Sequence, residues 1–241
     1  MLEAAWWGFV GGSALLVGAI AGVLLPVGPR LVGVVMAFGS GALISALSFD
    51  LTVESFDLGG GTAVVVGLLA GSLAFFAGDA VIDRRGGHRR KSPTGPQPGA
   101  GATALVLGAT LDGIPESAAI GVTLLEGGAV GAAFVAAVFL SNLPEAWSAS
   151  AGMKSAGHRT AAILRLWLLV TAASTLAAAL GYGLLGGATP FAIAVTQAFA
   201  AGAILTMLAD TMVPEAVEHA GPLVGLVAAL GFTAAFLIWA G

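Results

Sequence analysis

The sequence contains no cysteine, and only 9% of its 241 residues are charged. Without cysteine there is no disulfide framework and no thiolate metal site. Soluble domains carry about 25% charged residues, so this scarcity of charge excludes an ordinary soluble domain. The first residues also lack the basic stretch that begins a cleaved signal peptide, because Glu3 and Trp6 stand there instead. The chain is therefore predicted to be an integral membrane protein.

Apolar segments fill most of the chain. Hydrophobic residues make up 58% of it, its mean hydropathy is +0.99, and its 37 glycines favour close approach of helices in lipid. A membrane-spanning helix needs about 20 apolar residues, and these segments are too long and alternate too little for barrel strands. We predict one all-α transmembrane domain over 1–241, with a cytoplasmic loop at 84–101 and eight spans: 4–25, 31–53, 61–82, 102–125, 128–152, 160–185, 190–213 and 221–240.

The basic residues predict how these spans are oriented. All nine lie in connections that follow odd-numbered spans, or one turn beyond such a connection: Arg30, Arg84, Arg85, Arg89, Arg90, Lys91, Lys154, Arg159 and Arg165. With eight spans these connections share one side, and lysine and arginine mark the cytoplasmic side. We therefore expect a plasma-membrane protein, of the bacterial inner-membrane kind, with both termini outside the cytoplasm.

An internal repeat relates two distant spans. The segment AFGSGALISALSFDLTVES, beginning at Ala37, resembles AFAAGAILTMLADTMVPEA, beginning at Ala198, at an offset of 161 positions (198 − 37). The alignment has no gap and matches Glu54 with Glu215. The second and seventh spans run in opposite directions, and inverted repeats of this kind are typical of secondary transporters. The predicted plan is three helices, a central pair and three inverted helices.

The central pair carries two Pro-Glu steps, in DGIPES at 112–117 and SNLPEA at 141–146. Proline has no N–H, so each step frees the carbonyl four residues earlier. In lipid such a carbonyl is costly unless it faces water, protein or an ion. A polar face accompanies each step, because residues four apart share one side of a helix. Asp112 lies beside Glu116 in this way, and Ser141 or Asn142 beside Glu145.

These acids need a positive partner in the membrane. A charged side chain at that depth costs about 2.5–3.5 kcal/mol, and the only basic residue in a span is Arg165, near the cytoplasmic edge. The acids are therefore either protonated or neutralised by a bound cation. Carboxylate, amide and carbonyl oxygens suit a divalent cation. We predict a metal site at Asp112, Glu116, Ser141, Asn142 and Glu145; a simple proline kink beside a protonated glutamate is the alternative.

Two further acidic pairs stand near predicted span ends. Asp50 and Glu54 lie at the outer end of the second span, and Asp210 and Glu215 at the inner end of the seventh. Each pair is either a solvated helix terminus or part of a route for metal. His219 is either a cytoplasmic helix cap or a ligand on the exit side of that route.

These motifs resemble those of the ZIP family of divalent metal transporters. That family has eight helices in a three-two-three inverted repeat, outward termini and a variable cytoplasmic loop after the third helix. Its fourth helix carries His-Asn-x-Pro-Glu-Gly, and its fifth carries a similar motif that begins with His or Gln-Asn. The resemblance extends over nearly the whole chain, and its most specific parts are DGIPES and SNLPEA.

The resemblance implies a role for each matching residue. Glu116 and Glu145 match the two metal-bridging glutamates, and Asn142 matches the polar residue of the fifth helix. Asp112 stands in place of the fourth-helix histidine, with Gly113 where its asparagine would be, and Ser141 stands in place of the fifth-helix histidine or glutamine. In the sixth span Ser174 and Thr175 replace the family's Glu-Pro, so a second metal site is expected to be missing.

Without histidine, the predicted ligand atoms are all oxygens, which favour hard metal ions. We expect one metal site that tilts toward manganese, magnesium or iron(II), with zinc still favoured by the Irving–Williams order. The expected function is secondary transport of such divalent ions into the cytoplasm, with the ion as substrate and no prosthetic group. The expected surroundings are a lipid bilayer and, in one interpretation, a second copy of the chain in a homodimer. No feature predicts binding of nucleic acid.

Two other functions remain as alternatives. A diverged ZIP-like protein would keep this scaffold but move another substrate or relay protons through its acids. An intramembrane protease needs Gly-x-Gly-Asp or Gly-x-Ser-Gly. The segments FAGDA and AFGSG both lack the first glycine, and no span holds a histidine to act as base. We therefore expect that the protein is not an enzyme.

Overall fold

The computed structural model describes residues 1–25, 28–82, 84, 100–125 and 131–241, with the side chains of 100–106 left aside. All elements in these residues are helical, which confirms the predicted all-α class. Their bounds are α1 Leu2–Leu24, α2 Pro29–Ala46, the π-helix η1 Leu47–Val53, α3 Glu54–Ile82, α4 Ala100–Thr123, α5 Ala132–Ser155, α6 Thr160–Leu185, α7 Pro190–Met207, the π-helix η3 Leu208–Met212, α8 Val213–Ala220, the 3₁₀ turn η4 Gly221–Leu223 and α9 Val224–Ala240.

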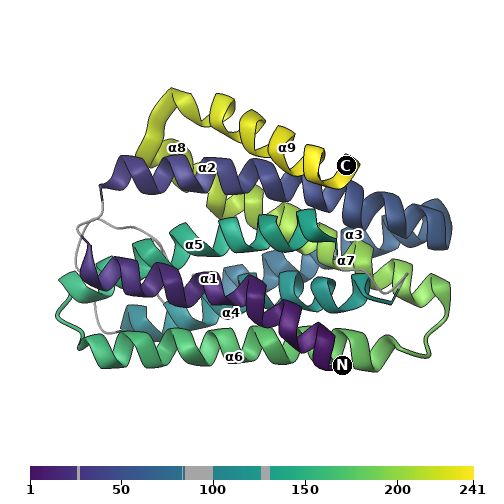
Figure 1. Ribbon diagram of the computed structural model, residues 1–241, viewed down its shortest axis with the longest axis horizontal. Coiled ribbons are helices and arrows are strands. Elements are labelled where there is room, and N and C mark those ends of the chain that lie inside the picture. The colour runs from purple at the N-terminus through teal and green to yellow at the C-terminus, as the bar shows by residue number, and fades with distance from the viewer. Residues whose placement is uncertain (26–27, 83, 85–99, 126–130) are drawn as a thin grey trace.

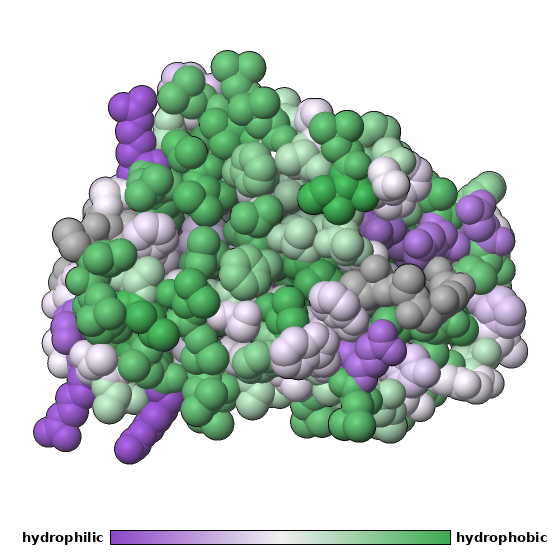
Figure 2. All heavy atoms as spheres, viewed as in Figure 1, coloured by the Kyte–Doolittle hydropathy of each residue, from purple (hydrophilic) through white to green (hydrophobic). Residues whose placement is uncertain are grey.

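The surface is that of an integral membrane protein. Hydrophobic side chains cover most of the middle of the molecule, and hydrophilic ones gather near the ends of its long axis (Figure 2). Within the described residues, four continuous helical stretches are long and apolar enough to cross a membrane: Leu2–Leu24, Pro29–Ile82, Thr160–Leu185 and Pro190–Ala240. Two of them, of 54 and 51 residues, are far longer than one crossing requires.

Each of the two long stretches reverses direction at a glycine. Gly60 has φ 71° and Gly221 has φ 67°, a region that a side chain disfavours and glycine enters readily. After the reversals the chain packs back, α3 against α7 and α9 against α2. We call the two ends of the molecule the Gly60 end and the Gly221 end; both chain termini lie at the Gly60 end (Figure 1).

The reversals lie beyond two of the predicted span ends. The helix that begins at Pro29 does not stop at residue 53 but continues through η1 and into α3 as far as Gly59. The helix that begins at Pro190 likewise passes 213 and continues to Ala220, so that α9 starts at Val224 rather than at 221. The π-helices carry the chain through both predicted ends without a break, and at the second end the helix also continues past Pro214.

The remaining elements differ from the predicted spans by a few residues at most. α1 and α4 each begin and end up to two residues earlier than expected, and α6 has the expected bounds. α5 begins at Ala132, after a predicted start at 128 that lies outside the described residues, and it ends at Ser155. Most of the predicted loop at 84–101 also lies outside them, and α4 already begins at Ala100.

Several structural features recur 161 positions apart. The π-helices begin at Leu47 and at Leu208, and the reversals lie at Gly60 and at Gly221. The same offset relates the segments that the sequence repeat aligns. The repeat therefore extends from side chains to two unusual backbone conformations in the same order along the chain.

Close helix crossings recur in the same way. A Cβ added to Gly41 of α2 would meet the carbonyl oxygen of Ala228 in α9, and one added to Gly202 of α7 would meet that of Leu68 in α3. Gly41 and Gly202 are again 161 positions apart. The partner glycines behave alike, since Gly231 lies against the carbonyl of Phe38 and Gly71 against that of Phe199. Small residues of this kind let helix backbones meet in a membrane.

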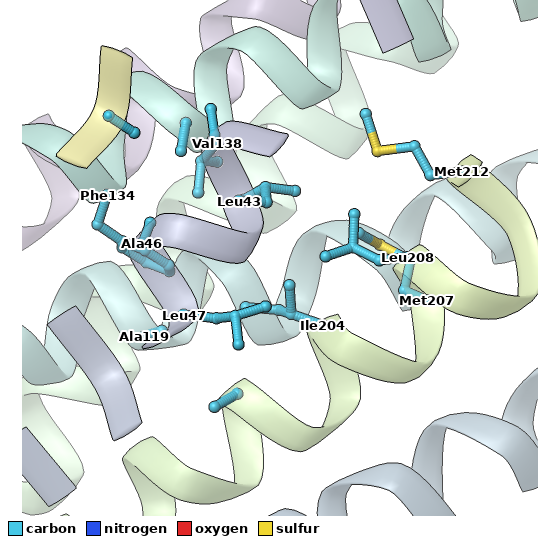
Figure 3. Packing of buried hydrophobic residues seen from close by; sticks show 14 of the residues in the cluster. Leu43, Ala46, Leu47, Ala119, Phe134, Val138, Ile204, Met207, Leu208 and Met212 are labelled. Carbon is cyan, nitrogen blue, oxygen red and sulfur yellow. The ribbon is translucent and has the colours of Figure 1, made fainter. Parts of the chain in front are cut away.

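The helices pack as two groups. α2, α3, α7, α8 and α9 form one group, through the α3–α7, α2–α9 and α2–α8 contacts. α1, α4, α5 and α6 form the other, through the α1–α5, α1–α6 and α4–α6 contacts. Contacts of α2 with α5 and of α4 with α7 join them. Apolar side chains fill this junction, and Figure 3 shows Leu43, Leu47, Phe134, Val138 and Ile204 within it.

Candidate functional site

The two Pro-Glu steps lie inside continuous helices. Pro115 is within α4 and Pro144 within α5, and both helices continue beyond the proline. The carbonyl of Leu140, which Pro144 leaves without its helical N–H partner, faces Gly39 of α2: a Cβ on that glycine would lie 3.0 Å from the carbonyl oxygen. Protein backbone therefore covers this carbonyl at the junction of the two helix groups, which satisfies the requirement that it not face lipid.

All five predicted metal ligands are buried. Asp112 and Glu116 of α4 are 2% and 1% exposed, and Ser141, Asn142 and Glu145 of α5 are 4%, 4% and 8% exposed. Buried carboxylates of this number are uncommon unless they are paired or bind a cation. Arg165, the basic residue inside a predicted span, is exposed on α6 and does not neutralise them.

A hydrogen bond joins the two motifs across α4 and α5. The Ser141 hydroxyl lies 3.3 Å from Oε1 of Glu116 and 2.9 Å from the carbonyl oxygen of Val138, and it donates toward these oxygens. Asn142 turns to another helix: its Nδ2 donates to the carbonyl of Gly11 in α1 over 3.5 Å. The motif of α5 is thus tied to α4 through Ser141 and to α1 through Asn142.

The five residues are brought to one region but not into a closed metal cage. Among the side chains that the structure describes, no three from histidine, aspartate and glutamate lie together as metal ligands would. A hydrogen bond between Ser141 and Glu116 links the two helices within this region. Asp112 stands one turn from Glu116 along α4, and Glu145 one turn from Ser141 along α5.

Apolar side chains close the region toward the Gly60 end. Ile120 follows Glu116 by one turn on α4, and Val138 and Phe134 precede Ser141 by one and two turns on α5. Phe134, Ile120 and Val138 are completely buried. Gly11 holds two of them together, because a Cβ there would lie 3.1 Å from Ile120 and 3.3 Å from Val138. We call Ile120, Phe134, Val138 and Leu47 the apolar seal (Figure 3 shows the last three).

The first predicted pathway pair does not lie at a helix terminus. Asp50 is 3% exposed within η1, and Glu54 is half-buried at the start of α3. The carboxylate of Asp50 points at the first turn of α5, where a Cβ on Gly131 would lie 2.7 Å from Oδ1. The solvated-terminus interpretation of Asp50 is therefore wrong, because the π-helix turns this side chain into the protein.

The second predicted pair is more open. Asp210 is exposed in η3, and Glu215 and His219 are half-buried in α8. Nδ1 of His219 lies 2.7 Å from the carbonyl oxygen of Glu215 one turn earlier. Each of the two π-helices therefore carries an aspartate, but Asp50 in η1 is buried and Asp210 in η3 is exposed.

Gln197 and Ser55 are among the fully buried polar residues that were not singled out from the sequence. Gln197 of α7 and Ser55 of α3 are both 0% exposed, and Nε2 and Oε1 of Gln197 and Oγ of Ser55 have no hydrogen-bond partner. The signal for Gln197 was present, because it is the only amide in the apolar run from Pro190 to Met207. Ser55 gave no comparable signal, since serine is common in membrane helices.

Comparison with known proteins gives one informative similarity. No protein-family model matches the chain. The chain is 26% identical, over 213 residues, to an Arabidopsis thaliana protein that bears the name "Putative zinc transporter". That alignment covers 87% of this chain and 34% of the plant protein, so the chain spans about a third of the length of this curated relative. The similarity connects the chain with zinc-transporter-like membrane proteins.

Proposed function

We propose that the chain is a ZIP-like secondary transporter that moves divalent metal cations toward the cytoplasm. The observation that carries this proposal is the Ser141–Glu116 hydrogen bond, which joins two Pro-Glu motifs whose five polar residues are all buried. The plant relative's name, together with an alignment that covers 87% of this chain, also supports a role in metal transport.

The arrangement that we propose has eight spans. Reversal at Gly60 and at Gly221 divides each of the two long stretches into two crossings, and α1, α4, α5 and α6 supply the others. The features repeated at an offset of 161 support two three-helix units of opposite direction around α4 and α5. The distribution of lysine and arginine supports a cytoplasmic Gly221 end and external termini.

The cation that we propose binds between α4 and α5. Glu116, Asp112 and Glu145 would supply carboxylate oxygens, and Ser141 and Asn142 would supply hydroxyl and amide oxygens. When a cation binds, the hydrogen bond from Ser141 to Glu116 would break, and Ser141 would offer an oxygen lone pair to the ion while it keeps its proton. Asp112 and Glu145, one turn away, would supply the further carboxylate oxygens. Oxygen ligands without histidine favour harder ions such as Mn²⁺, Mg²⁺ or Fe²⁺, although Zn²⁺ still binds well by the Irving–Williams order.

Transport requires that the site open alternately to the two sides. We propose that the apolar seal closes the site toward the external face, and the complete burial of Phe134, Ile120 and Val138 supports this. The seal lies where the two helix groups meet, so a relative movement of the groups opens it. We propose that Asp50 and Glu54 lie on the external route and that Asp210, Glu215 and His219 lie on the cytoplasmic one.

A second candidate is a ZIP-like protein that relays protons or moves another substrate. The absence of a three-ligand acidic or histidine cluster among the described side chains favours it, as do Asp112 and Ser141 in place of histidines. In this case the Ser141–Glu116 hydrogen bond carries a proton rather than standing in for a metal bond.

Uptake by proteoliposomes separates the two candidates. Purified protein is tested with Zn²⁺, Mn²⁺, Fe²⁺, Cd²⁺, Co²⁺ and Mg²⁺, beside Glu116→Gln and Glu145→Gln. Glu3→Gln is the control, because Glu3 is an exposed acid in the first turn of α1. We expect metal uptake by the wild type and the control and loss in both test variants. Absence of metal uptake from folded wild-type protein would exclude the transporter and leave the proton relay.

A further inference from the structure

Gln197 presents a buried polar group that packing alone does not explain. Its side chain is completely buried, and neither amide atom has a hydrogen-bond partner. It lies on the inward face of α7, in register with Ala201, Ile204 and Leu208, which are buried in the core. Buried polar groups in proteins are nearly always satisfied, so an orphaned amide indicates a water or an ion. A leucine or methionine would fill this space without that requirement.

Ser55 lies opposite Gln197. The helix that ends at Gly59 and the helix that begins at Pro190 run in opposite directions, and a Cβ on Gly59 would lie 2.6 Å from Cβ of Ala194. Ser55 is one turn before Gly59, and Gln197 one turn after Ala194, on these same contacting faces. Both side chains therefore lie at the same depth, one turn inward from the contact. The Ser55 hydroxyl, like the Gln197 amide, has no partner.

Asp50 adds a carboxylate about one helical turn farther from the Gly60 end than Ser55. η1 packs against α7, and the helix runs without interruption from Asp50 to Ser55. Thr52 donates its hydroxyl to the carbonyl of Leu47 five residues earlier, over 2.7 Å, which is the spacing of a π-helix. This wide turn leaves Asp50 buried, with Oδ2 unpaired and Oδ1 against Gly131. Leu47, part of the apolar seal, follows on the cytoplasmic side.

We propose that Gln197, Ser55 and Asp50 form a second cation site, external to the apolar seal, that receives a divalent cation before it reaches Glu116 and Glu145. The inference rests on the proposed function and adds Gln197 as a residue that determines specificity. Amide, hydroxyl and carboxylate oxygens suit hard ions such as Mn²⁺ and Mg²⁺, which keep several waters when bound. One carboxylate and two neutral ligands make the site weak enough to release the ion.

A binding titration tests the site without requiring transport. Mn²⁺ binding to the purified chain in detergent is followed by the electron paramagnetic resonance signal of free Mn²⁺, in a Glu116→Gln/Glu145→Gln background. We expect one weak Mn²⁺ site to remain there. Adding Gln197→Leu should weaken it about tenfold, the low end of the range for supporting groups of metal sites. Absence of Mn²⁺ binding in the folded background protein overturns the proposal.

Thr196→Val is the matched control for the titration. Thr196 is the neighbouring polar residue of α7, and its hydroxyl already donates to the carbonyl of Ala192 over 2.9 Å. Its loss should leave Mn²⁺ affinity unchanged. Equal weakening by Thr196→Val and Gln197→Leu would show a general effect on α7 and would count against the site.

Two opposite substitutions keep the proposal testable in the native background. Gln197→Leu removes a ligand and should raise the KM of Mn²⁺ uptake, whereas Gln197→Glu adds a charge and should lower it. A merely structural role moves KM in the same direction for both variants, or moves neither. If the wild type binds Mn²⁺ but transports none, the proposed function fails, and the binding titration alone decides on the outer site.

Discussion

At the scale of single residues, we propose that the ion preference depends on Ser141. It joins α5 to Glu116 of α4, at the position where the resembled family places histidine or glutamine. The Pro-Glu steps made the burial of Glu116 and Glu145 predictable. A carboxylate and a carbonyl freed by proline are both costly in contact with lipid, so this face of the helix turns toward the protein. The bond of Asn142 to the carbonyl of Gly11 was not predictable, since α1 carries no polar side chain at that contact.

Ser141→His should shift the preference of the site from manganese toward zinc. Imidazole suits Zn²⁺, whereas a hydroxyl oxygen suits harder ions. We expect the zinc-to-manganese ratio of binding constants to rise about tenfold, which corresponds to about 1.4 kcal/mol. Competition titration of the purified protein measures this ratio. Ser155→His is the control, because Ser155 is exposed at the end of the same helix and should leave the ratio unchanged.

At the scale of elements, helices were easier to predict than the details within them. Eight apolar runs of about 20 residues indicated where helices lie, and the predicted start of the last span at 221 coincides with a reversal of the chain. Neither π-helix was predicted, because an extra residue in a helical turn leaves the apolar pattern almost unchanged. Asp50 was consequently interpreted as a possible helix end, whereas η1 buries it. Gln197 was not predicted, because an uncharged amide in an apolar helix does not need a cationic partner as the acids do.

Close helix contact at Gly41 should be essential for the stability of the α2–α9 pair. A Cβ there meets the carbonyl of Ala228, so Gly41→Ala forces the two backbones apart. Overpacking of this kind costs about 1–3 kcal/mol, and we expect a lower thermal unfolding midpoint in detergent. Gly202→Ala, 161 positions later, should act likewise on the α7–α3 pair.

Gly225→Ala provides the control for these variants. Gly225 also lies in α9, but nothing stands within 4 Å of the Cβ position. Alanine favours a helix over glycine by about 1 kcal/mol, so the midpoint should stay or rise slightly. A midpoint for Gly41→Ala as high as that for Gly225→Ala would contradict the close crossing.

At the scale of the whole molecule, two distant segments of the chain share several structural features. The matching segments, the starts of the π-helices, the reversals and the closely packed Gly41 and Gly202 recur 161 positions apart, although only the matching segments were visible in the sequence. Division into two helix groups was not predictable, because it depends on which of many glycine and alanine faces meet. The candidate site lies between α4 and α5, which belong to one group, and the apolar seal lies where that group meets the other.

Locating a bound cation would show whether the two Pro-Glu motifs hold one metal ion between α4 and α5. Crystals of the protein grown with Mn²⁺ would be measured for anomalous scattering at a wavelength above the manganese absorption edge. We predict one strong peak within coordination distance of Glu116 and Glu145 and next to Ser141, absent from the Glu116→Gln variant. A well-ordered α4–α5 region without that peak, at a Mn²⁺ concentration that saturates binding in solution, would contradict the account.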